Sequence, residues 1–163
     1  MHVRSLVLIG VLASLHLIAC NGDNEGEACG PTSGIVSQVF DGDTIELDDG
    51  TRLRYLLIDT PEMNSSNSKD PECFASEAKE FNENMVLNKK VTIEYDEDCD
   101  DAYDRLLSYV SIDDASINKL MLERGYAKLL YIEPNKLYLE EFQRVATLAE
   151  EAKSGLWGAC EEE

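Results

Sequence analysis

Hydrophobic and polar residues alternate along several short stretches of the chain, and this alternation is typical of half-buried strands. By this criterion we expect five strands, at 35–40, 44–47, 51–58, 89–95 and 105–112. After the third and fifth strands, apolar residues recur at helical spacing instead. We therefore expect three helices, at 72–88, 116–124 and 137–153.

The order of these elements indicates the α+β class, with short strands that form a small barrel and helices added to it. The chain has 163 residues, which suits one domain plus a short appendage. Its hydrophobic content of 44% is enough to build a core.

The stretch 39–62 concentrates charged residues between apolar runs. Gly42 lies between two aspartates, a pattern that favours a tight turn, and 48–50 reads DDG, a strong hairpin signal. Pro61 cannot donate a hydrogen bond to a sheet, so the next strand ends before it. The hairpin is therefore expected to bring Asp43 close to Asp59.

Arg54 stands inside a strand that is apolar on both faces. An unpaired buried charge is costly, so this arginine needs an anionic partner. The partner is either one of the nearby carboxylates, in a structural salt bridge, or the phosphate of a ligand.

The residue types fit phosphodiester hydrolysis, which needs a charged clamp, an activated water and stabilisation of the leaving oxygen. Asp43 and Asp59 are hard oxygen ligands for Ca²⁺ or Mg²⁺, and the Thr60 carbonyl adds a third. Glu62 is the candidate base for the attacking water. Arginine side chains at 54 and 105 can hold a phosphate through two hydrogen bonds each, which lysine cannot.

Three motifs, in this order, resemble those of the staphylococcal nuclease (thermonuclease-like) family. They are DGDT at 41–44, R-x-x-x-x-D-T-P-E at 54–62 and D-x-Y-x-R at 101–105, and the resemblance covers about 34–157. It implies an OB-type five-stranded barrel with three helices. It also implies endonucleolytic hydrolysis of DNA and RNA that leaves 3′-phosphate ends.

The resemblance assigns roles residue by residue. Calcium ligands are implied at Asp43, Asp59 and the Thr60 carbonyl, and catalytic residues at Arg54, Glu62 and Arg105. Substrate contacts are implied at Tyr103 and at Tyr131, although the local spacing around Tyr131 differs from the family by about one residue.

The formal charge of −19 opposes this interpretation, because affinity for nucleic acid comes mainly from cations near phosphates. Ala102 stands where the family often has a lysine, and Asp104 is positioned to neutralise Arg105 in part. Only a bound divalent cation and clustered arginines can offset this repulsion, by attracting phosphate locally.

The first 19 residues have a basic Arg4 and a short apolar run, and they read as a secretory signal. The ending L-I-A-C resembles a bacterial lipobox, which implies cleavage before Cys20 and its lipidation; an ordinary signal peptide is the alternative. We expect a polar tether at 20–33, the domain at 34–160 and an acidic tail at 161–163. Both histidines precede Cys20, so histidine-based chemistry is excluded after cleavage.

Four other cysteines remain, and an even number in an exported chain predicts two disulfides. Three pairings are possible. We favour Cys73–Cys99, between a helix start and a loop, and Cys29–Cys160, between the two ends of the domain. A metal site made of four thiolates is disfavoured because the chain has no C-x-x-C pair.

Two functional hypotheses remain. The first is a monomeric, membrane-anchored, calcium-dependent nuclease acting on DNA or RNA in the cell envelope. The second is a non-catalytic domain of the same fold that binds calcium or a protein partner, which the acidic balance favours. An oligonucleotide-binding module is a third possibility, but it calls for exposed aromatics flanked by Lys and Arg, a pattern that we do not find in the sequence.

Overall fold

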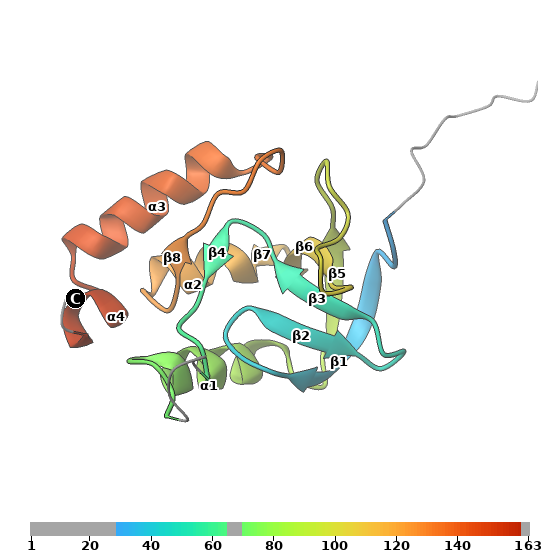
Figure 1. Ribbon diagram of the computed structural model, residues 1–163, viewed down its shortest axis with the longest axis horizontal. Helices are drawn as coiled ribbons and strands as arrows, with labels where there is room; N and C mark the ends of the chain where they lie inside the picture. Colours follow the sequence, from blue (N-terminus) through green and yellow to red (C-terminus); the bar gives the residue numbers. More distant parts are fainter. Residues whose placement is uncertain (1–28, 65–69, 161–163) are drawn as a thin grey trace, which may run out of the picture.

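A computed structural model describes residues 29–64 and 70–160 (Figure 1). Its centre is a barrel of five strands in the order β3-β2-β1-β5-β6. Each strand in this order is antiparallel to the next. The strands are β1 (Ser33–Val39), β2 (Thr44–Leu47), β3 (Arg52–Tyr55), β5 (Lys90–Glu94) and β6 (Leu106–Ile112).

Strand β3 also pairs with β6 in parallel, with Leu53 opposite Leu106 and Arg54 opposite Leu107. This pairing closes the sheet, so the two outermost strands protect each other's edges. The prediction of an α+β fold with a five-stranded barrel and three helices is confirmed.

The predicted helices are α1 (Ala75–Val86), α2 (Ile117–Glu123) and α3 (Leu139–Glu151), and a short α4 (Leu156–Ala159) follows. Two further short strands, β4 (Ile58–Asp59) and β8 (Lys128–Leu129), form a separate antiparallel pair, and β7 (Ala115–Ser116) extends the main sheet beside β6. Helix α1 lies against one side of the barrel, and α3 packs on α2 at the other side (Figure 1).

The core forms where inward-facing strand residues meet the helices, because alternate residues of a strand point to the same face. It contains fully buried side chains from each principal strand and from α2, including Val36, Ile45, Leu53, Val91, Val110 and Met121. Tyr55 is also buried, and its hydroxyl donates a 3.0 Å hydrogen bond to Asn82 Oδ1 on α1. This polar contact fixes α1 against the barrel.

The prediction of one continuous strand at 51–58 is wrong, because β3 ends at Tyr55 and the chain turns sharply at Leu57 before β4. Leu57 has a φ of 62°, and its carbonyl accepts a hydrogen bond from Leu130 N. Leu56, Leu57 and Ile58 are all buried, and the turn contacts α2, where Asn118 Nδ2 donates to the Leu56 carbonyl at 3.0 Å. The turn places Asp59 on β4, outside the barrel sheet.

The disulfide pairing favoured from the sequence is wrong: the bonds are Cys29–Cys99 and Cys73–Cys160 rather than Cys73–Cys99 and Cys29–Cys160. Cys29 precedes β1, which runs antiparallel to β5, so it lies beside the loop after β5, and its Cα is 5.1 Å from that of Cys99.

The second disulfide joins α4 to the start of α1, with 5.9 Å between the Cα atoms of Cys73 and Cys160. The turn after α2 brings these segments together. Tyr126 stacks on Phe74, and Leu156 N donates to the Gly125 carbonyl. One end of the domain is therefore fixed to the loop after β5, and the other end is fixed to the start of α1.

Several predictions concern residues that lie outside the described part of the chain. They are the signal at 1–19, lipidation of Cys20, most of the tether at 20–33 and the tail at 161–163. The end of the expected tether belongs to the domain, because Ile93 N donates to the Thr32 carbonyl and β1 begins at Ser33. Among the described residues, no helix has the length and hydropathy needed to cross a membrane.

Candidate active site

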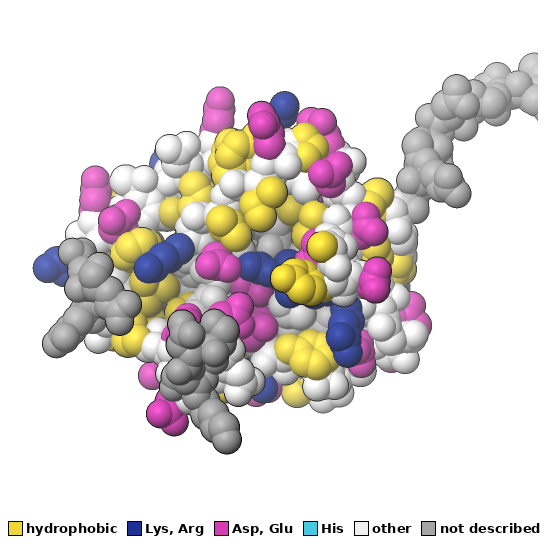
Figure 2. All heavy atoms as spheres, viewed as in Figure 1, with side chains coloured by type: hydrophobic (Ala, Val, Ile, Leu, Met, Phe, Trp, Pro, Cys, Tyr) yellow, Lys and Arg dark blue, Asp and Glu magenta, His cyan; other side chains and the backbone are white. Residues whose placement is uncertain are grey.

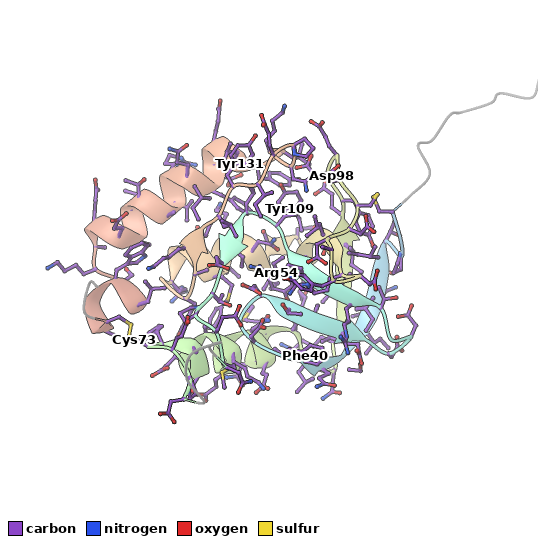
Figure 3. The ribbon with its side chains drawn as sticks, viewed as in Figure 1. Phe40, Arg54, Cys73, Asp98, Tyr109 and Tyr131 are labelled. Atoms are coloured by element: carbon purple, nitrogen blue, oxygen red, sulfur yellow. A yellow bond between two sulfur atoms is a disulfide. The ribbon has the colours of Figure 1, made fainter. Side chains whose placement is uncertain are left out.

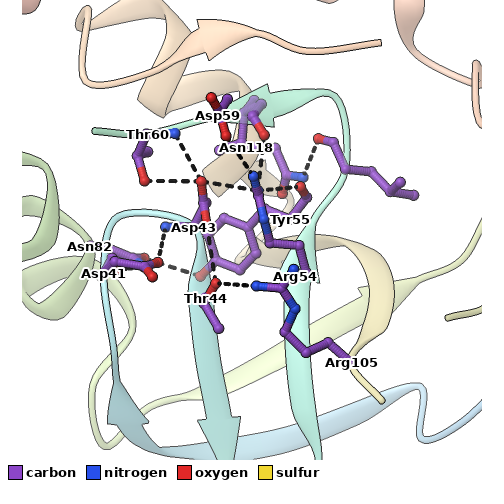
Figure 4. Close-up of polar contacts among 12 residues, drawn as sticks. Asp41, Asp43, Thr44, Arg54, Tyr55, Asp59, Thr60, Asn82, Arg105 and Asn118 are labelled. Carbon is purple, nitrogen blue, oxygen red and sulfur yellow. Dashed lines mark hydrogen bonds and ion pairs between the residues drawn. The ribbon is translucent and has the colours of Figure 1, made fainter. Parts of the chain in front are cut away.

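Arg54 is the centre of a polar cluster at the end of the β2–β3 hairpin (Figure 4). Its Nη1 lies 3.0 Å from Asp43 Oδ2, and its Nη2 lies 2.9 Å from Asp59 Oδ1. Nη1 also donates to the carbonyls of Tyr55 and Ile58, at 3.1 and 2.9 Å. The turn at Leu57 makes this possible, because it directs the Ile58 carbonyl and Asp59 back toward the arginine.

Asp43 is buried at the start of β2 and accepts several hydrogen bonds. Its Oδ2 accepts from Thr60 N at 2.8 Å and from Thr60 Oγ1 at 2.9 Å, and its Oδ1 accepts from Thr44 Oγ1 at 3.1 Å. Burial raises the pKa of Asp43 above its usual range, and Asp41 adds to this, whereas Arg54 and Thr60 oppose it.

Arg105 lies on the same side of the molecule as this cluster. It stands just before β6, and its Nη1 is 3.5 Å from Thr44 Oγ1, the hydroxyl that donates to Asp43 (Figure 4). Its Nε donates to Asp101 Oδ2 at 2.8 Å. The parallel pairing of β3 and β6 therefore brings Arg54 and Arg105 to one site.

The expected neutralisation of Arg105 comes from Asp101, four residues earlier, and not from the adjacent Asp104. Burial acts to raise the pKa of Asp101, but hydrogen bonds from the side chain of Arg105 and from backbone N–H groups lower it overall. Asp104 instead has a φ of 59° and lies in the turn between Asp101 and Arg105.

Glu62 and Arg105 face the same hollow, whose volume is about 400 Å³. Its lining residues are Phe40, Thr44, Arg52, Glu62, Tyr103 and Arg105. Figure 2 shows basic, acidic and hydrophobic side chains beside one another around a hollow near the middle of this face.

Glu72, which precedes α1, binds both the main-chain N–H and the main-chain carbonyl of Glu62. Glu62 N donates to Glu72 Oε2 at 2.9 Å, and the Glu62 carbonyl accepts from Glu72 N at 3.0 Å. Desolvation, with the negative charge of Asp41, raises the pKa of Glu62 despite the opposing effect of Arg54. A carboxylate with a raised pKa is better suited to accept a proton near neutral pH.

The donor chemistry of the cluster fits a hard divalent cation. Asp43, Asp59 and Thr60 present carboxylate and carbonyl oxygens, the ligands that Ca²⁺ and Mg²⁺ prefer. Negative charge is in excess, because Asp41 and Glu62 add to the field of the two aspartates that Arg54 bridges. Within 29–64 and 70–160, however, no three acidic, cysteine or histidine side chains are already gathered as a metal site.

The two tyrosines expected to contact substrate are placed differently. Tyr103 lines the hollow, is 77% exposed and has its ring centroid 5.3 Å from Cζ of Arg105. Tyr131 follows β8 and is not among the residues that line the hollow; Figure 3 shows it well apart from Arg54. The structure thus joins every expected catalytic and metal residue, and Tyr103, but not Tyr131.

Sequence reasoning missed several residues of this site. The sequence assigns Asp41 to a turn and to the DGDT motif but to no role in the site, yet its Oδ1 accepts from Asp43 N at 3.0 Å and its charge affects both Asp43 and Glu62. The D-x-D spacing was the available signal. Phe40 and Arg52 also line the hollow, and no local pattern marks them.

Comparisons with known proteins identify the family of this chain. Residues 52–159 match the family described as staphylococcal nuclease homologues. Two relatives from Bacillus subtilis strain 168, the SPbeta prophage-derived endonuclease YokF and endonuclease YncB, are each 35% identical over 127 residues. These alignments cover 75% of this chain but only 43% and 60% of the relatives.

A thermonuclease of Staphylococcus hyicus is 34% identical over 125 residues, which cover 75% of this chain and 73% of the relative. Its alignment therefore spans most of both proteins. With the family match over the barrel and helices, it establishes that this chain belongs to the staphylococcal nuclease family.

Proposed function

We propose that the protein is a calcium-dependent endonuclease that hydrolyses DNA or RNA to products with 3′-phosphate ends. One observation carries the proposal most strongly: Glu62 and Arg105, far apart in the chain, line one hollow beside the cluster formed by Asp43, Arg54 and Asp59. The relatives named above as endonucleases and a thermonuclease support the same class of reaction.

In the proposed reaction, Glu62 accepts a proton from a water molecule whose oxygen attacks the phosphorus atom. The bond from phosphorus to the 5′ oxygen breaks, and that oxygen takes a proton from solvent, which leaves a 3′-phosphate and a 5′-hydroxyl. Arg54 and Arg105 stabilise the negative charge that develops on the phosphoryl oxygens, as donors positioned beforehand do best.

Calcium, when bound, supplies positive charge that stabilises the phosphoryl oxygens. Asp43, Asp59 and the Thr60 carbonyl are the proposed ligands. Thr60 is held in place by its two hydrogen bonds to Asp43, so its carbonyl has a fixed position relative to that carboxylate.

Replacement of Glu62 by glutamine tests the proposal, because it keeps the shape of the side chain and removes the proton acceptor. With calcium and single-stranded DNA, E62Q should lose at least about a hundredfold in rate while it still binds the strand. Unchanged turnover in E62Q would reject the proposed mechanism.

The alternative function is a non-catalytic domain that binds calcium or a partner. The observation that favours it is that each of the two arginines is already paired with acids, Arg54 with Asp43 and Asp59, and Arg105 with Asp101. The two functions differ in one result: the alternative predicts binding without turnover in the unmodified protein.

We also propose that the protein is exported and anchored by lipid at Cys20, and that it acts as a monomer in the cell envelope. Two disulfides are typical of oxidising compartments outside the cytosol. The L-I-A-C sequence that ends at Cys20 supports the anchor. Metabolic labelling with a fatty acid should mark the protein, and a C20A variant should stay unlabelled.

A further inference from the structure

Arg52 is a side chain of the hollow to which the proposed reaction gives no role. Its side chain is 54% exposed, and its Cζ lies 5.1 Å from the ring centroid of Phe40. Its Nε donates to Glu46 Oε2 at 3.1 Å. Among the described residues this is the one hydrogen bond of its side chain, so the two Nη groups remain available to a ligand.

The register of the barrel places Arg52 in line with the proposed reaction site. Arg52 and Arg54 are two residues apart on β3, so their side chains leave the same face of the strand. Two residues along a strand span about 6.6 Å. This distance is comparable with one nucleotide step of an extended single strand.

Three arginine side chains gather at this place although the protein as a whole is strongly acidic. The protein carries a formal charge of −19, which repels nucleic acid over long range. Arg52 and Arg105 nevertheless line the same hollow, and Arg54 lies beside it. Ala102, in the segment before Arg105, carries no charge. Arg52 therefore supplies a cation that this segment lacks.

Aromatic rings accompany the two exposed guanidinium groups. Phe40 is half-buried beneath Arg52 and fixes its position, and Tyr103 is exposed beside Arg105. Alternating cations and rings are the features by which proteins bind single strands, because the cations bind phosphates while bases stack on the rings. Bases that are paired in a duplex are not free to stack in this way.

We propose that Arg52, positioned by Phe40 and Glu46, binds the phosphate next to the scissile one, and that the adjoining base stacks on Tyr103. This inference rests on the proposed function, since the scissile phosphate is the one at Glu62 and Arg105. It makes Arg52 a substrate-binding residue that favours single-stranded over double-stranded nucleic acid.

The test measures binding separately from hydrolysis. In the E62Q background with calcium, fluorescence anisotropy of a labelled single-stranded DNA of mixed sequence is followed against salt concentration. R52Q should weaken binding by roughly tenfold and should reduce the slope of log K against log salt by about 0.7, the loss of one phosphate contact on a single strand.

Arg144, exposed on α3, provides a control with the same change of net charge. R144Q should leave the slope as it was, and E46Q, which removes only the partner of Nε, should bind at least as tightly as its parent. R52K should recover part of the affinity, because it keeps the charge and loses the planar fork. Equal affinity and slope in R52Q and R144Q would overturn the inference.

Measurements of KM and kcat for hydrolysis distinguish this inference from the proposed function. In the active protein, R52Q should raise KM for single strands by roughly tenfold, and the loss should fall on KM rather than on kcat. An unmodified protein that binds the strand through Arg52 without cleaving it would reject the nuclease proposal alone. An active nuclease whose KM is indifferent to R52Q would reject the subsite alone.

Discussion

Arg54 on β3 and Asp43, the residue before β2, form an ion pair, with 3.0 Å between Nη1 and Oδ2 and with both side chains largely shielded from solvent. Thr44, next to Asp43, pairs with Arg54 in the register of the hairpin, which explains their proximity. The same guanidinium holds Asp59, so one residue organises both acids proposed to bind the cation.

Replacing Arg54 should therefore affect both stability and activity. R54A leaves Asp43 without its ion-pair partner and should lower the free energy of unfolding by about 3 kcal/mol, measured by urea denaturation. R54K keeps a charge but lacks the planar fork whose two Nη atoms contact different acids, so it should fold and still lose at least about a hundredfold in rate. An R54K protein with full activity would remove Arg54 from the proposed mechanism.

Asp101 and Asp104 offer a matched pair of substitutions around Arg105. Asp101 holds Nε of Arg105 at 2.8 Å, and Asp104 lies in the intervening turn. D101N should lower kcat/KM on the order of tenfold, because Arg105 loses the contact that orients it. D104N removes the same charge and should change kcat/KM much less. Equal losses in both variants would show a general charge effect instead.

The dependence of activity on pH follows from the raised pKa of Glu62, caused by desolvation and by Asp41. A base must be unprotonated, so kcat/KM should fall as pH drops through this raised pKa. D41N removes one cause of the shift, and it should move the acidic limb of the profile to lower pH. The measurement is kcat/KM against pH at saturating calcium; a limb that stays in place in D41N would contradict the assignment.

Calcium should stabilise the folded protein, because the cluster around Arg54 carries an excess of negative charge. At a calcium concentration of about 100 times Kd, binding adds about 2.7 kcal/mol. For a domain of this size, Tm should rise by roughly 5–10 °C. D43N should lose most of this rise, whereas D114N, an exposed acid in the loop before β7, should keep it.

Local patterns in the sequence predicted the barrel strands and the three main helices, because alternation and helical spacing report burial directly. They did not predict the turn at Leu57. A leucine with positive φ has no local signature, and the hydrogen bond from Leu130 that accompanies it joins residues distant in the chain. The position of Asp59 depends on that turn.

The motifs predicted most of the candidate site for a similar reason: the acids and Arg54 lie within one hairpin and its exit. Residues whose neighbours come from other strands were harder to predict. Phe40 approaches Arg52 across the barrel strands, and the correct disulfides depend on strand order and on the turn after α2. Such contacts between distant segments leave no local pattern.

Digestion of single-stranded DNA by residues 21–163 tests most directly whether this cluster hydrolyses phosphodiester bonds with calcium. The expected result is cleavage with calcium, none with a chelator, 3′-phosphate ends on the products, and loss of cleavage in the E62Q variant. Intact DNA after prolonged incubation with folded, calcium-bound protein would contradict the proposed nuclease activity.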